Sequence, residues 1–213
     1  MALTFHYGSG SPYNWRVWLA LEHKRIPYEL KMLSFSEGDT KKPEYLAINP
    51  RGRVPAIVDD GFALYESAAI LEYLDEKHAS EPRLFPGDVR QRALARRMVR
   101  EADQYFATAM EQLVEHILFT PPEKRSQEPI AKARAVIGEE LAMWESLIAG
   151  DYLAGPLSAA DFTLYPQIAL VLRMERQQPD LNARVLIGPK LTAWMARIEA
   201  LPFFRRTWPS HWK

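Results

Sequence analysis

At residues 49–58 the chain reads Asn49-Pro50-Arg51-Gly52-Arg53-Val54-Pro55-Ala56-Ile57-Val58, and at residues 65–71 it reads Tyr65-Glu66-Ser67-Ala68-Ala69-Ile70-Leu71. The apolar run after the proline predicts a buried strand that ends at the turn Asp59-Asp60-Gly61. Because proline has no N–H, it belongs at the start or the edge of a strand. We therefore expect a strand of about residues 54–58 that begins at the Val-Pro step.

The proline also affects its neighbour. With Pro55 at the beginning of the strand, the backbone N–H and C=O of Val54 stay available for an extended segment. X-Pro bonds are cis in only about 5–6% of cases in folded proteins, so these residues alone predict a trans bond.

Glu66 and Ser67 precede a second predicted element, a helix from residue 68 to 77 with side chains spaced i, i+3, i+4 and i+7. Ser67 stands at the N-cap or in the first turn, where free N–H groups and the positive end of the dipole favour an anion. Ser67 would hold a carboxylate there, and Glu66 would hold an ammonium group beside it. The simpler alternative, which the local sequence favours, is that Ser67 only caps the helix and Glu66 only complements its dipole.

The remaining pattern predicts two domains. Strands are expected at residues 3–7, 28–33, 54–58 and 62–65, and helices at about 11–24 and from 67. This β-α-β, β-β-α order is typical of an α/β thioredoxin-like domain, which we place at residues 1–79. A linker rich in proline and glycine follows at residues 80–88. Strand signals then vanish, and helices at about 89–119, 129–148, 158–174 and 189–201 predict an all-α helical bundle domain at residues 89–213.

Composition narrows the functional classes. The chain has 213 residues and a formal net charge of zero, which argues against nucleic-acid partners. It has no long uncharged apolar run, so we expect no membrane partner and a cytoplasmic location. It contains no cysteine, so any thiol chemistry must arrive with a ligand. The five histidines show no ligand spacing, and we expect no metal.

Four motifs in this order resemble the cytosolic glutathione S-transferase family. They are Ser11-Pro12-Tyr13 with Arg16-Val17, Asn49 to Pro55, Glu66 to Leu74, and the capping box Ser158-Ala159-Ala160-Asp161. The resemblance covers nearly the whole chain. The Ser11-Pro12-Tyr13 start is most similar to the serine-type classes tau, theta, zeta and phi, as found in plants and bacteria. The resemblance raises the expectation of a cis Val54-Pro55 bond. It also marks Arg25 as a departure, because the family usually places glycine near this helix end, and a left-handed arginine costs about 1–2 kcal/mol.

The resemblance implies that the ligand is glutathione, γ-Glu-Cys-Gly. Ser67 and Glu66 would bind its γ-glutamyl end, and the backbone of Val54, held by Pro55, would pair with its cysteinyl residue as an added strand. Arg53, with Lys41 or Lys42, would neutralise the glycine carboxylate. For the two lysines, a solvated surface position remains an equal alternative.

The thiol of glutathione must ionise for chemistry, and a free thiol has a pKa of about 8.5. Ser11 is the expected catalytic residue, since its hydroxyl can donate to the sulfur beside a helix N-terminus. Tyr7 and Tyr13 are rivals for this role, and a purely capping role for Ser11 is compatible with the catalytic one.

The second substrate is expected to be a hydrophobic electrophile against an apolar wall. The aromatic and apolar candidates for that wall are Phe35, Tyr105, Met110, Phe119 and Trp208. For each of them a place in the core is at least an equal alternative. The implied activity is glutathione conjugation in detoxification. Alternatives on the same fold are a glutathione-dependent isomerase, a disulfide reductase or a non-catalytic ligand-binding module. The family's dimer interface includes the arginine-rich start of the long helix, so a homodimer is expected.

Overall fold

The computed structural model describes residues 3–80 and 82–212, which form two compact units. The first unit comprises Met1–Pro86 together with Pro202–Lys213, and the second comprises Gly87–Leu201. The boundary between the units lies within the predicted linker at residues 80–88. The sequence assigns the C-terminal tail to the helical domain, but the structure groups it with the first unit.

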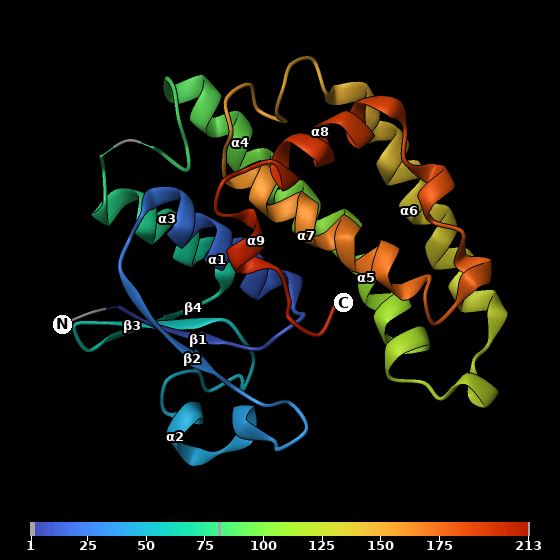
Figure 1. Cartoon of the computed structure of the whole chain (residues 1–213), viewed down its shortest axis with the longest axis horizontal. Helices are drawn as coiled ribbons and strands as arrows, with labels where there is room; N and C mark the ends of the chain where they lie inside the picture. Colours follow the sequence, from blue (N-terminus) through green and yellow to red (C-terminus); the bar gives the residue numbers. More distant parts are fainter. Residues whose placement is uncertain (1–2, 81, 213) are drawn as a thin grey trace. The chain divides into compact units, whose positions relative to one another are not determined.

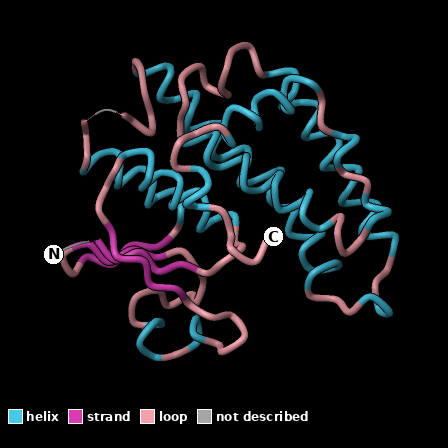
Figure 2. The backbone as a smooth tube through the Cα atoms, viewed as in Figure 1, coloured by secondary structure: helices cyan, strands magenta, loops and turns pink. Residues whose placement is uncertain are grey.

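The first unit is built on a four-stranded mixed sheet in the order β2-β1-β3-β4. Figure 2 draws the strands of this sheet in magenta. Its strands are β1 (Leu3–Tyr7), β2 (Tyr28–Met32), β3 (Ala56–Asp59) and β4 (Phe62–Tyr65). β1 pairs with β2 in parallel and with β3 in antiparallel fashion, and β3 pairs with β4 in antiparallel fashion. All four predicted strands are present, although β3 begins two residues later than predicted, after Pro55.

Helices cover both faces of this sheet (Figure 1). On one face lie α1 (Pro12–Lys24) and α3 (Ser67–Lys77), and on the other lie a 3-10 turn (Asp39–Lys41) and α2 (Pro43–Leu46). The predicted thioredoxin-like arrangement is confirmed.

The C-terminal tail packs on α1 through aromatic side chains. Its short helix α9 (Phe204–Thr207) is followed by Trp208 and the buried Trp212. Phe204, Trp208 and Trp212 all surround Trp15, with ring centroids 5.3–5.8 Å from that indole. Burial of several large aromatic rings explains why the tail belongs to this unit.

Among the residues described, the second unit is built of helices, with one isolated β-bridge between Tyr152 and Gly155. Its helices are α4 (Val89–Glu101), α5 (Ala107–Leu113), α6 (Gln127–Leu147), α7 (Ala159–Met174) and α8 (Pro189–Glu199). Two π-helical segments, Ala102–Phe106 and Val114–Leu118, interrupt the long helix that the sequence predicts at 89–119. The predicted capping box of α7 is present: the fully buried Asp161 carboxylate accepts hydrogen bonds from the N–H and hydroxyl of Ser158, from Leu153 N–H and from Trp194 Nε1.

The end of α1 shows how the chain accommodates Arg25. This residue is left-handed, with φ 55° and ψ 36°. Its N–H bonds to the Glu22 carbonyl at 3.1 Å, and the Ile26 N–H bonds to the Leu21 carbonyl at 3.0 Å, which is the Schellman pattern. Ile26 is itself buried. Hydrogen bonds and apolar burial therefore offset the steric cost of the arginine Cβ.

Arg25→Gly is expected to raise the free energy of unfolding. It removes about 1–2 kcal/mol of left-handed strain, against about 0.5–1 kcal/mol for the greater freedom of glycine in the unfolded chain. Arg25→Ala keeps the Cβ and serves as the control, with little gain. Urea denaturation of the three proteins measures the difference, and equal stability of the two variants would contradict this account.

Candidate functional site

The strand registers bring three separate segments to one edge of the sheet. His6 lies opposite Ala56, and Ala56 lies opposite Tyr65. The segments that follow β1, precede β3 and follow β4 are therefore neighbours at this edge. They carry Ser11, Val54-Pro55 and Glu66-Ser67, the residues that the sequence singles out.

Ser11 occupies the N-cap position of α1, with extended backbone angles and Pro12 in the first turn. Its hydroxyl makes no capping hydrogen bond, and within residues 3–80 and 82–212 it has no other hydrogen-bond partner. Pro12, the first helical residue, lacks an N–H and so removes one of the unpaired donors of the first turn. The hydroxyl stands at the positive end of a helix with its donor available.

The loop before Ser11 is held from two sides by residues of its own unit. Asn14 Nδ2 donates to the Gly8 carbonyl at 3.0 Å, and the ring of Phe35 packs closely against Gly8. The Tyr7 hydroxyl donates to Ser9 Oγ at 3.2 Å, and burial raises the pKa of Tyr7. Tyr13, the other rival to Ser11, has its ring 5.4 Å from the Arg16 guanidinium.

The turn before β3 is fixed through one carbonyl. The Arg53 carbonyl accepts hydrogen bonds from the Tyr45 hydroxyl at 2.6 Å and from Asn49 Nδ2 at 2.7 Å. Burial raises the pKa of Tyr45 to about 12, so the phenol remains a donor at neutral pH. The Val54-Pro55 bond is cis, as the resemblance implies and against the base rate. Among the residues that the structure describes, none hydrogen-bonds to the backbone of Val54.

Ser67 is the first residue of α3 and is buried, with Glu66 at the N-cap. Its Oγ accepts a short hydrogen bond from Arg16 Nη2 of α1. Glu66 is exposed and lies 3.8 Å from Arg51 Nε. Its φ of 69° costs a non-glycine residue about 1–3 kcal/mol, strain that tends to persist where function requires it.

Arg16 is a part of the site that sequence reasoning missed. Arg16 is 3% exposed and lies among the buried residues of α1, where it places a fixed positive charge behind Ser67. A charged residue five positions after Ser11 was visible in the motif, but only the packing of α1 against α3 shows what it contacts.

The two candidate lysines face different partners. Lys41 Nζ reaches the Gly52 carbonyl at 3.4 Å, which places it beside the Arg53 turn. Lys42 Nζ instead pairs with Asp39 at 2.5 Å. Arg53 is exposed.

The candidates for the apolar wall are distributed over both units. In the first unit Phe35 is 55% exposed, and Trp208 packs edge-on against Trp15. In the second unit Tyr105 and Phe119 are 51% and 73% exposed, whereas Met110 is buried. Met110 is therefore corrected to a core residue, because its side chain offers no accessible surface.

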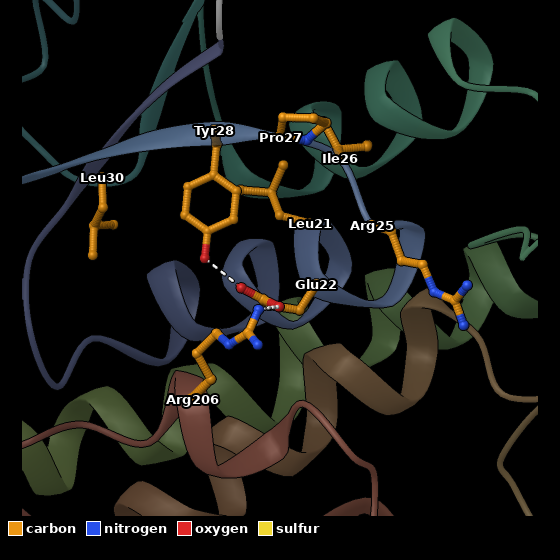
Figure 3. A pocket seen from close by; sticks show the side chains of 8 residues that line it. All are labelled: Leu21, Glu22, Arg25, Ile26, Pro27, Tyr28, Leu30 and Arg206. Atoms are coloured by element: carbon orange, nitrogen blue, oxygen red, sulfur yellow. Dashed lines mark hydrogen bonds and ion pairs between the residues drawn. The ribbon is translucent and has the colours of Figure 1, made fainter.

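A second hollow of the first unit lies apart from these segments, between the end of α1, β2 and the tail (Figure 3). Its volume is about 490 Å³. At its centre Glu22 accepts hydrogen bonds from the Tyr28 hydroxyl at 2.5 Å and from Arg206 of the tail at 2.8 Å. Burial raises the pKa of Tyr28. The polar groups drawn together here bind one another, so this hollow is primarily an anchor for the tail.

Residues 3–80 and 82–212 contain no group of three histidine, aspartate or glutamate side chains arranged to hold a metal ion. No helix within the same ranges is long and apolar enough to cross a membrane.

Comparisons with known proteins identify the family of the chain. A family model described as "Glutathione S-transferase, N-terminal domain" matches residues 10–77. Glutathione S-transferase 3 of Zea mays is 31% identical, over 92% of this chain and 89% of the relative. A probable maleylacetoacetate isomerase 2 of Drosophila melanogaster is 33% identical, over 93% of this chain and 84% of the relative.

Among solved structures, a glutathione transferase from Burkholderia graminis with two glutathione molecules bound per subunit matches with a TM-score of 0.82. It is 26% identical, over 97% of this chain and 87% of that chain. The first unit thus has the thioredoxin-like fold of glutathione transferases. The chain belongs to the cytosolic glutathione S-transferase family, and it is a glutathione transferase.

Gly52→Ala is expected to disrupt the turn before β3. Gly52 has a φ of 58°, and a Cβ there would lie 2.7 Å from the Thr40 carbonyl oxygen. Gly38 is the matched control, because its φ of 68° is similar and nothing lies within 4 Å of its Cβ position. We expect Gly38→Ala to cost about 1 kcal/mol of unfolding free energy and Gly52→Ala about 2 kcal/mol more. Urea denaturation of both variants measures this, and equal costs would show that the turn is not crowded.

Proposed function

We propose that this transferase conjugates the thiolate of glutathione to hydrophobic electrophiles, with Ser11 stabilising the thiolate. One observation carries the proposal: Ser11 stands at the N-cap of α1, but its hydroxyl does not cap the helix. A capping serine uses its oxygen as an acceptor, whereas a hydroxyl free of that bond can donate to sulfur.

The energetic requirement is modest. Each unit by which the thiol pKa falls corresponds to about 1.4 kcal/mol of preferential thiolate stabilisation. A hydrogen bond to a charged group contributes roughly 1.5–3 kcal/mol, and the helix dipole adds about 0.3–1 kcal/mol. The Ser11 hydroxyl and the N-terminus of α1 together are sufficient to make the thiolate the main form near neutral pH.

The geometry supports Ser11 over its two rivals. The Tyr7 phenol is 3% exposed and already donates to Ser9, so it has no free donor to offer a ligand. The Tyr13 ring lies against the Arg16 guanidinium. Tyr13 lies in the first turn of α1, but its ring is engaged by Arg16, whereas among the described residues the Ser11 hydroxyl has no such neighbour.

The peptide is held at the same sheet edge. Val54 would pair with the cysteinyl backbone as an added strand. Ser67 would donate its N–H to the γ-glutamyl carboxylate. Arg16 supports this role, since it bonds to Ser67 Oγ from beneath, which leaves the hydroxyl proton to point at the ligand. Glu66, exposed at the N-cap, would take the ammonium group.

The glycine carboxylate of glutathione would be bound by Arg53 and Lys41. Lys41 lies beside the same turn as Arg53, whereas Lys42 is committed to Asp39. Glutathione bound to the Burkholderia graminis relative supports the ligand itself.

A glutathione-dependent isomerase is the second candidate, because a relative 33% identical to this chain is named as a probable maleylacetoacetate isomerase. The zeta-class isomerases carry a Ser-Ser-Cys motif where this chain has Ser11-Pro12-Tyr13. The absence of that cysteine favours conjugation. Detoxification, a cytoplasmic location and a homodimer through the arginine-rich α4 remain parts of the proposal that rest on the family resemblance.

Ser11→Ala is expected to lower kcat for a chloronitrobenzene electrophile by roughly tenfold or more, because the thiolate loses its donor. The Kd of glutathione should change by less than about threefold, since the peptide contacts remain. Ser11→Thr keeps the hydroxyl and is the matched control. Wild-type turnover in Ser11→Ala would transfer the role to Tyr7 or Tyr13.

Lys41→Ala and Lys42→Ala form a matched pair for the glycine carboxylate. Loss of a charge-assisted contact should raise the Kd of glutathione by roughly tenfold in Lys41→Ala and by less than about twofold in Lys42→Ala. Isothermal titration calorimetry measures both values. The reverse order would assign the contact to Lys42.

A further inference from the structure

The C-terminal tail reaches the loop that carries Ser11. His211 Nδ1 and Ser9 Oγ share a hydrogen bond of 2.8 Å. The same imidazole covers Gly10: a Cβ built on Gly10 would lie 2.9 Å from both His211 Cε1 and Nε2. His211 therefore contacts the two residues that directly precede Ser11.

The tail is itself firmly attached to α1. Trp15 Nε1 donates to Thr207 Oγ1 at 2.9 Å, inside the aromatic cluster of the tail. Arg206 pairs with Glu22, whose side chain is only 8% exposed, in the hollow shown in Figure 3. Trp212, directly after His211, is 5% exposed. Anchors before and after His211 fix where its ring lies.

The loop needs such an external contact. It contains Gly8 and Gly10, and Gly10 has a φ of 88°, so its backbone is intrinsically free. Its own turn bond, from the Ser11 N–H to the Gly8 carbonyl, is long at 3.4 Å. A hydroxyl that stabilises a thiolate must be held to within about 0.5 Å. Asn14 restrains the loop at Gly8, and His211 restrains it at Ser9 and Gly10.

We infer that His211 is a positioning residue for Ser11: through Ser9 and Gly10 it fixes the loop so that the Ser11 hydroxyl is aimed at the glutathione sulfur. The inference rests on the proposed role of Ser11 in stabilising the thiolate. It assigns the last turn of the chain to the catalytic machinery of the first unit.

The measurement is the pKa of the glutathione thiol in the enzyme complex, read from thiolate absorbance in the ultraviolet as pH is varied. His211→Ala is expected to raise this pKa by about one unit, a roughly tenfold loss of thiolate preference. The Kd of S-methylglutathione, which has no thiol, should stay within about twofold, because the peptide contacts are untouched. A loss of S-methylglutathione affinity as large as the thiol effect would reduce His211 to a general structural role and overturn the inference.

His211→Asn is the conservative variant, because the asparagine amide places a polar δ atom where the imidazole has Nδ1. It should restore most of the wild-type thiol pKa, whereas His211→Gln, whose amide is one bond longer, should not. Asparagine does not titrate, so rescue also excludes the charge of His211 as the cause. His116→Ala, in the π-helical segment of the second unit, is the matched control and should behave as wild type.

A double-mutant cycle separates this inference from the proposed function. If His211 acts through Ser11, then Ser11→Ala combined with His211→Ala should show no more than the Ser11→Ala effect. Additive effects would overturn the inference. If Ser11→Ala itself leaves the thiol pKa unchanged, the proposed function fails. If Ser11→Ala raises the thiol pKa and His211→Ala does not, the proposed function stands and the inference about His211 is overturned.

Discussion

The site depends on one constraint, the register of β3 between β1 and β4. Because His6 lies opposite Ala56 and Ala56 lies opposite Tyr65, segments that are far apart in the sequence are brought to one edge of the sheet. A slip of one residue would turn the side chains of β3 to the opposite face and move Val54-Pro55 away from its neighbours. The buried side chains of Phe5, Ala56 and Ile57 resist that slip.

In the proposed site, helix N-termini serve two purposes. The start of α3, with Arg16 behind Ser67, would bind a carboxylate, and the start of α1 would offer a hydroxyl to a sulfur. The Arg16–Ser67 hydrogen bond joins the two helices, so the two proposed parts of the site share one rigid frame. Rigidity matters because electrostatic stabilisation requires donors that are already in place.

The fold could be read from the sequence to within a few residues. Periodicity located β1, β4 and α3, and the Ser158–Asp161 pair located the start of α7. Sequence-based prediction failed for features that depend on contacts with residues distant in the sequence. The π-helical turns inside residues 89–119 do not change the spacing of apolar residues enough to be recognised in the sequence. Met110 was a candidate pocket residue because its burial depends on the residues that pack around it in the folded protein. The sequence grouped the tail with the helical domain, whereas the structure groups it with the first unit, because the aromatic side chains of the tail do not reveal their partner, Trp15.

The sequence by itself determined the kinds of groups at the site: a Val-Pro step, an acidic residue and a serine before a helix, a serine before Pro12, and no cysteine. Local chemistry is enough for these, since capping and turn preferences act within a few residues. Only the tertiary structure decided which groups face one another. It separated Lys41 from Lys42, put Arg16 behind Ser67, left the Ser11 hydroxyl free of its capping bond and brought His211 to Ser9. Such contacts are made by residues far apart in the chain, and only packing fixes them.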